Sequence, residues 1–137
     1  MDIIIYSEDP KIKPKILKVD GSKWSFPKYI NINDKDLSKT LFIYAQVYVK
    51  KRWIEAEEFI KKDPILAYYY ALNIIKGRWL EAEEFIIKNP WTACHYAIYI
   101  IKDRWPEAEK TIKEDPLIWS IYRNQVWPLR SSYIIEM

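Results

Sequence analysis

A tandem repeat of 26 residues constrains this chain more than any other feature. Residues 52–64 recur at 78–90 with ten of thirteen positions identical, and a third copy spans 104–116. A Tyr-Ala pair precedes each copy, first at Tyr44-Ala45, and Tyr122 continues the spacing after the third copy. A fixed period of this kind, without insertions, is typical of helical units that stack because none can bury its apolar face alone.

Each unit begins with a predicted helix. Asp63-Pro64 and the two equivalent pairs place an N-cap side chain directly before a residue that tolerates the first helical position. Gly77 follows the helix in the middle unit and is expected to take the left-handed turn that ends it. Between these signals, apolar residues occur at i, i+3, i+4, i+7 and i+8, the spacing of one helical face. In the middle unit they are Ala67, Tyr70, Ala71, Ile74 and Ile75.

A second, shorter helix is predicted after each Arg-Trp pair. Its early glutamates, such as Glu81 and Glu83, favour the positive end of the helix dipole. We expect each tryptophan, Trp79 in the middle unit, to fill the wedge between the two helices of its unit. The fold class is therefore predicted to be mainly α, a short α-solenoid of three 26-residue helix-pair repeats plus a terminal half-repeat, within residues 40–122.

The flanking segments differ from the repeats. Residues 1–39 contain the turn signal Asp20-Gly21 between the stretches 16–19 and 23–25, which predicts a small irregular or β-hairpin N-terminal cap. Residues 123–137 include Trp127 and are predicted to cover the last helix as a C-terminal capping segment. Because the ends of a solenoid need such caps, we expect one structural domain overall.

The repeat motif resembles a known group of short helical repeats. Residues 76–83, with a Tyr-Ala pair before them and Asn-Pro after them, are similar to the Y-A…K-G-R-W-x-E-A-E…D-P repeats of bacteriophage and giant-virus proteins. Lys51 and Asp103 depart from the glycine of that pattern. The resemblance implies origin and architecture rather than an activity. The helix-pair layout is more distantly similar to tetratricopeptide and Sel1-like repeats, which bind proteins, and this is an analogy of fold.

Neither catalysis nor metal binding is predicted. Arginines and paired glutamates recur in all three units, so we interpret them as ion pairs between stacked units; arginines presented to an anionic partner are the alternative. His95 is the only histidine and Cys94 the only cysteine, which leaves too few ligands for a zinc site. We therefore expect no metal, no cofactor and no enzymatic activity.

The positions that vary between units are the candidate binding residues. They lie at i, i+3, i+7 and i+10 of the first helix, beside its buried face, and their middle members change character between units. Neutral drift on a solvated face is the alternative explanation. The predicted binding residues, called the variable stripe below, are Ile43, Val47, Tyr69, Asn73, Lys76, His95, Tyr99 and Lys102.

The predicted function is a non-enzymatic protein–protein interaction module, a viral or phage protein that binds and inhibits a host protein. The charge balance of 22 basic against 19 acidic residues does not indicate nucleic acid, but a lysine and aromatic face keeps nucleic-acid or nucleotide binding as an alternative. A structural subunit that self-associates through the solenoid ends is a second alternative. No apolar run is long enough for a membrane span, so we expect no membrane contact and a cytoplasmic location, in the host if the protein is viral.

Overall fold

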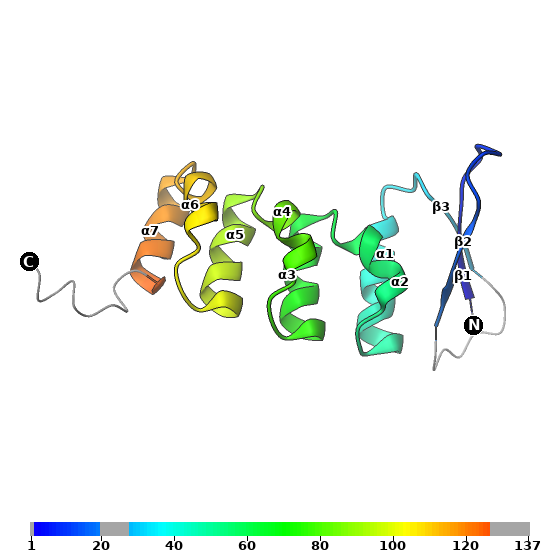
Figure 1. The fold of residues 1–137 in the computed structure, drawn as a ribbon, viewed down its shortest axis with the longest axis horizontal. Helices are drawn as coiled ribbons and strands as arrows, with labels where there is room; N and C mark the ends of the chain where they lie inside the picture. The colour runs from blue at the N-terminus through cyan, green and yellow to red at the C-terminus, as the bar shows by residue number, and fades with distance from the viewer. Residues whose placement is uncertain (1, 20–27, 127–137) are drawn as a thin grey trace, which may run out of the picture. The chain divides into compact units, whose positions relative to one another are not determined.

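The computed structural model describes residues 2–19 and 28–126 and is mainly helical, with a small sheet near the N-terminus (Figure 1). The chain divides into two compact units, Met1–Lys62 and Asp63–Met137. Each is described by itself below. No helix in the described part of the chain is both long and apolar enough to cross a membrane.

The first unit opens with a three-stranded sheet. Its strands are β1 (Asp2–Tyr6), β2 (Lys15–Lys18) and β3 (Lys28–Asn31), in the order β2-β1-β3. β1 pairs antiparallel with β2 and parallel with β3. A small cap that contains β structure is therefore present. The first arm of the hairpin predicted around Asp20-Gly21 pairs with β1, and its turn and second arm lie outside the described residues.

Side chains alternate between the two faces along each strand, and one face of the sheet is buried. Ile3, Ile5, Leu17 and Ile30 are at most 7% exposed, as expected for side chains at every second position of strands that cover a core. Lys15 forms an ion pair with Glu58, and its ammonium lies 5.5 Å from the ring centroid of Phe59. These contacts tie β2 to the helices of the same unit.

The helices of the first unit form a pair, and the first of them ends in a π-helical turn. α1 (Leu37–Tyr44) continues directly into the π-helical segment η1 (Ala45–Val49), and α2 (Ile54–Ile60) packs against α1. The first helix of the predicted repeat therefore begins at Leu37, and the second is seven residues long.

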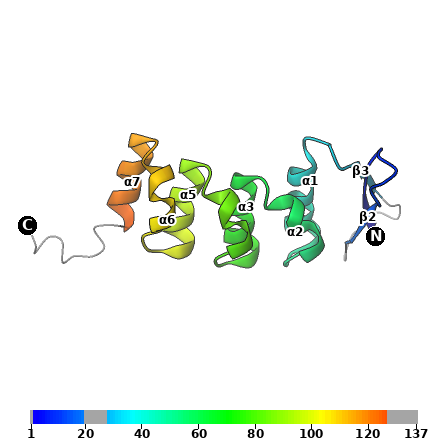
Figure 2. The same cartoon turned by 45° about the horizontal axis from the view of Figure 1, so that its top comes forward.

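The second unit repeats this arrangement. In Figures 1 and 2, α3, α5 and α7 lie side by side within this unit. The π-helical segments η2 and η4 extend α3 and α5, and the short 3-10 helix η3 precedes α4. The elements are α3 (Pro64–Tyr70), η2 (Ala71–Ile75), η3 (Leu80–Ala82), α4 (Glu83–Ile86), α5 (Pro90–Tyr96), η4 (Ala97–Ile101), α6 (Pro106–Ile112) and α7 (Pro116–Val126).

The predicted starts of the first helices are confirmed. The Asp63 side chain accepts hydrogen bonds from the backbone N–H groups of Ile65 and Leu66, at 3.0 and 3.1 Å. Asp115 caps α7 in the same way, and the Asn89 side chain caps α5 with one hydrogen bond, accepted from the Thr92 N–H. Each cap satisfies amide groups that have no partner inside the helix, and the proline that follows has no amide to satisfy.

The predicted ends of the first helices are wrong by one residue. The left-handed position is a lysine, with φ of 60° at Lys50, 62° at Lys76 and 63° at Lys102, and not Gly77. The lysine N–H bonds the carbonyl of the alanine five residues earlier, for example Lys76 to Ala71 at 2.7 Å. This i to i−5 bond widens the last turn into a π-helix, so the reversal comes one residue before the glycine.

Trp79 and the alanines of the second unit occupy the predicted core positions. Trp79 is 2% exposed and packs on Tyr70, with ring centroids 4.8 Å apart, so the tryptophan lies against the first helix of its own repeat. Ala71 and Ala82 have no exposed surface, which is consistent with close approach of neighbouring helices.

Candidate functional site

A partly exposed aromatic cluster forms along α5 and η4. The rings of Trp91 and His95 are stacked with centroids 4.0 Å apart, and the rings of His95 and Tyr99 follow at 5.9 Å. These three residues lie four positions apart, so the helix itself places them in one row. We call Trp91, His95 and Tyr99 the aromatic run.

The preceding first helix contributes to the same cluster. Tyr69 lies 6.4 Å from Trp91, and Tyr68 meets Trp91 edge to face at 5.8 Å, measured between ring centroids. Tyr68 is 3% exposed, and its burial together with the nearby Tyr69 and Tyr99 hydroxyls raises the pKa of Tyr68 to about 12. Tyr68 is therefore the buried support of the cluster and stays protonated at neutral pH.

A hollow of about 240 Å³ lies at the end of the aromatic run. Tyr99 is 54% exposed and forms part of its wall. Lys76 and Lys102, the left-handed residues that end the two first helices, also contribute to its lining. We call this the lysine hollow. Its lining residues are Leu72, Lys76, Gly77, Tyr99, Ile100 and Lys102.

The structure distributes the variable stripe over both units. Ile43 and Val47 belong to the first unit and are 43% and 50% exposed. The remaining members belong to the second unit, where Asn73, Lys76, Tyr99 and Lys102 are exposed and Tyr69 and His95 are half-buried. Tyr69, His95 and Tyr99 enter one aromatic cluster, and Lys76, Tyr99 and Lys102 enter one hollow.

Trp91 is a functional candidate that the sequence reasoning missed. In the neighbouring repeats this position is occupied by Ile65 and Leu117. It comes directly after the proline that begins the first helix. Its substitution for an aliphatic residue was a signal of the same kind that identified the stripe. The helical spacing from Trp91 to His95 and Tyr99 would have linked the three residues.

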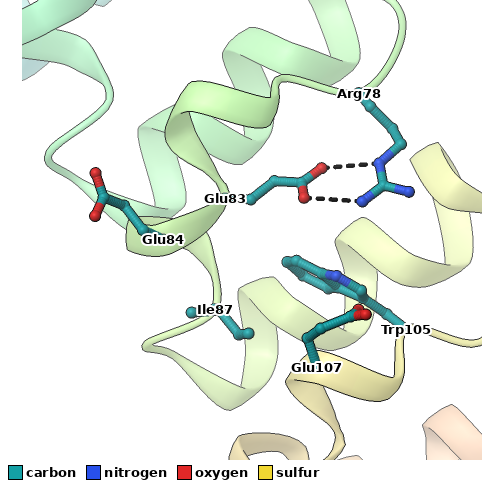
Figure 3. Close-up of a pocket in the computed structure, with 6 residues that line it drawn as sticks. All are labelled: Arg78, Glu83, Glu84, Ile87, Trp105 and Glu107. Carbon is teal, nitrogen blue, oxygen red and sulfur yellow. Dashed lines mark hydrogen bonds and ion pairs between the residues drawn. The ribbon is translucent and has the colours of Figure 1, made fainter.

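A second hollow, of about 400 Å³, lies on the second helices and contains paired charges (Figure 3). Arg78 donates two hydrogen bonds to Glu83, from Nε at 2.9 Å and from Nη2 at 2.8 Å. The ring of Trp105 lies beside this pair in Figure 3. The remaining lining residues are Glu84, Ile87 and Glu107.

Glu83 also accepts a hydrogen bond from the next repeat. The Tyr96 hydroxyl donates to Glu83 Oε2 at 2.6 Å and accepts the backbone N–H of Trp79 at 2.8 Å. Tyr122 makes the same two bonds with Glu109 and Trp105, at 2.7 and 2.8 Å. We call these recurring contacts the tyrosine network.

The predicted ion pairs between repeats are wrong, because the arginines pair within their own repeats. Arg52, Arg78 and Arg104 each pair with the glutamate five residues later in their own repeat. Within residues 63–126, the tyrosine hydroxyl of the next repeat is what links the arginine–glutamate pair to that repeat. Because Glu83 already holds three donors and its environment is repeated at Glu109, this arrangement is suited to folding rather than to proton transfer.

The network shifts the ionisation of its members. Hydrogen bonds from Arg104 hold the pKa of Glu109 below its ordinary value, outweighing the opposing effect of burial. Burial and the hydrogen bond to Glu83 raise the pKa of Tyr96 well above its ordinary value. Both groups therefore keep the protonation state that the network requires at neutral pH.

His95 and Cys94 have structural surroundings. His95 Nδ1 lies 2.9 Å from the Trp91 carbonyl, which only accepts, so Nδ1 carries the proton of this bond. Cys94 is fully buried, and burial raises the pKa of its thiol to about 11. In residues 2–19 and 28–126, no group of three or more His, Cys, Asp or Glu side chains is placed to hold a metal ion.

Comparisons of the chain with protein-family models, with curated proteins and with solved structures find no match. The function is therefore inferred from the sequence and from the geometry of the site.

Proposed function

We propose that this chain is a non-enzymatic interaction protein that binds a protein partner through the first helices of its repeats. The observation that carries the proposal is the aromatic run, in which three rings of different kinds are aligned and partly exposed next to the lysine hollow. The partner contacts in the second unit are assigned to Tyr69, Asn73, Lys76, Trp91, His95, Tyr99 and Lys102.

Aromatic side chains that are already held in place suit protein recognition. Tryptophan and tyrosine are enriched among the residues that dominate binding energy at interfaces. His95 is packed between Trp91 and Tyr99 and is also bonded to the backbone, so binding would immobilise few additional rotamers. The entropy lost on association is correspondingly small.

The chemistry of the other candidate groups supports a non-enzymatic role. The Glu83 carboxylate is bonded to Arg78 and Tyr96, and the same set recurs one repeat later. Cys94 is buried with a raised pKa, which disfavours the nucleophilic thiolate at neutral pH. Both features have a structural explanation that does not require a substrate.

The repeat suggests the wider setting of the protein. We propose that the helix pairs form a short solenoid. The 26-residue spacing between the network residues Tyr96 and Tyr122 extends back along the sequence to Tyr44. The similarity of the motif to repeats of bacteriophage and giant-virus proteins supports a viral or phage origin. The partner would then be a host protein, bound and inhibited in the host cytoplasm.

Selection from a random peptide library tests the proposal. The full chain is immobilised and used to select phage-displayed dodecapeptides, and each enriched peptide is then measured against a Tyr69→Ala plus Tyr99→Ala variant. We expect the variant to lose affinity for the enriched peptides, because both rings belong to the proposed surface. Circular dichroism before and after heating checks that the variant is folded.

A matched control lies on the second helices. Ile54 and Leu80 are 63% and 66% exposed, so they are apolar residues outside the stripe that a peptide is also able to reach. The Ile54→Ala plus Leu80→Ala variant is expected to bind the peptides as the wild type does. If this variant loses the peptides and the tyrosine variant keeps them, the proposed surface is wrong.

A further inference from the structure

We infer that the lysine hollow binds a carboxylate group from an acidic segment of the protein partner. The inference rests on the proposed function and adds the chemistry of the partner. Two of the six lining residues are lysines, and none is acidic. An anionic side chain that enters the hollow therefore meets positive charge from both repeats.

The backbone at the two lysines supports a use for their side chains. Lys76 and Lys102 have φ of 62° and 63°, a left-handed conformation in which a Cβ is sterically strained and glycine is not. The equivalent Lys50 has the same conformation. The turn itself would form more easily with glycine, so the turn does not explain a lysine in all three repeats.

The remaining walls favour a protein segment over the backbone of a nucleic acid. Leu72, Ile100 and the Tyr99 ring supply apolar surface beside the lysines. Such apolar walls suit a hydrophobic side chain of a peptide and offer nothing to a continuous line of phosphates. A short segment with an acidic residue next to a hydrophobic one fits both the hollow and the adjoining aromatic run.

Gly77 provides a test that leaves the two lysines intact. A Cβ added at Gly77 would meet no heavy atom within 4 Å, and Gly77 lines the hollow. The equivalent positions in the neighbouring repeats carry Lys51 and Asp103, so the backbone accepts either charge there. Gly77→Asp and Gly77→Lys therefore change the charge of the hollow in opposite directions at one site.

The experiment uses the dodecapeptides whose selection depends on Tyr69 and Tyr99. We expect these peptides to be enriched in Asp and Glu relative to the starting library. Their affinities are measured by fluorescence anisotropy. Lys76→Gln plus Lys102→Gln and Gly77→Asp should each weaken binding by about threefold to tenfold, as expected for one or two partly exposed ion pairs, and Gly77→Lys should strengthen it.

The control replaces two exposed lysines that do not line the hollow, Lys62→Gln plus Lys110→Gln, with the same change in net charge. It is expected to leave the affinity within twofold of the wild type. Equal losses in the control and in the hollow variant would overturn the inference, because a general charge effect would then explain both. Equal losses from Gly77→Asp and Gly77→Lys would also overturn it, as a purely steric result.

The outcomes separate this inference from the proposed function. Peptides that depend on Tyr69 and Tyr99, but lack acidic enrichment and ignore the charge at position 77, would leave the proposed function standing and refute the carboxylate site. Peptides that do not depend on the tyrosines would refute the proposed function. A labelled oligothymidylate that binds more tightly than the acidic peptides, and is lost with the two lysines, would assign the hollow to phosphate and overturn the inference.

Discussion

The tyrosine network and the variable stripe occupy the same repeats but differ in composition and burial. The network uses the same Arg, Trp, Glu and Tyr residues in successive repeats, and Trp79, Tyr96 and Tyr122 are at most 2% exposed. The stripe changes from Tyr69 and Asn73 to His95 and Tyr99, and it is largely exposed or half-buried. The buried residues that recur between repeats therefore form the contacts that fold the protein. The exposed positions, whose middle members change between repeats while the lysines recur, form the surface available for recognition.

Removal of the tryptophan ring is expected to have the largest effect on the network. Trp79→Ala should lower the free energy of unfolding by about 3–5 kcal/mol, because the ring is buried against Tyr70 and truncation leaves a cavity. Urea denaturation measures the loss. Leu80→Ala, at the adjacent position that is 66% exposed, should stay within about 0.5 kcal/mol of the wild type. Similar losses for the two variants would show that burial does not distinguish them.

Removal of a single hydroxyl compares the network with the stripe directly. Tyr96→Phe should lower the free energy of unfolding by about 1–3 kcal/mol, because the Trp79 amide and Glu83 each lose a hydrogen-bond partner. Tyr99→Phe removes the same atom from a side chain that is 54% exposed and should cost much less. Denaturation curves for both variants provide the comparison, which fails if Tyr99→Phe is the more damaging substitution.

Acid should weaken the network through Glu109. Its pKa is lowered in the folded protein, so its contribution is complete above its ordinary pKa of 4.5 and is lost as the pH falls through the lower folded value. Unfolding free energies measured between about pH 6 and pH 3 should therefore fall less steeply for Glu109→Gln than for the wild type. Parallel pH profiles would remove Glu109 from the account of acid sensitivity.

Replacing the left-handed Lys76 of the stripe by glycine is expected to stabilise the protein slightly. Lys76→Gly should raise the free energy of unfolding by up to about 1 kcal/mol, because glycine adopts the positive φ of this turn without a steric penalty. The same change at Lys110, inside α6, should lower it by about 1 kcal/mol. Thermal denaturation resolves the opposite signs. A loss of stability at Lys76 would mean that its side chain contributes to folding.

The repeat pattern predicted the helices because their signals are local. The Asp63-Pro64 pair contains both the capping side chain and the residue that follows it, and the structure shows the expected cap. The period also identified Trp79 as a buried residue, since one apolar face must recur at every stacked unit. Neighbouring residues were sufficient to predict the cap, and the period was sufficient to predict the burial of Trp79.

Contacts between segments were harder to predict. The partner of Glu83 across repeats is Tyr96, thirteen residues later, and the sequence pattern alone favoured an arginine in that role. The left-handed lysine was missed because propensity favours the adjacent Gly77, whereas the π-helical turn ends one residue earlier. The aromatic run depended on Trp91, which lies outside the positions chosen for the stripe.

The division of labour between network and stripe is tested most directly by peptide affinity. A selected peptide is measured by anisotropy against Tyr96→Phe and Tyr99→Ala at a temperature where circular dichroism shows both variants to be folded. We predict that Tyr96→Phe, although less stable, binds as the wild type does, and that Tyr99→Ala, although stable, loses about tenfold or more in affinity, as for a residue central to an interface. Loss of affinity in Tyr96→Phe with full affinity in Tyr99→Ala would contradict the account.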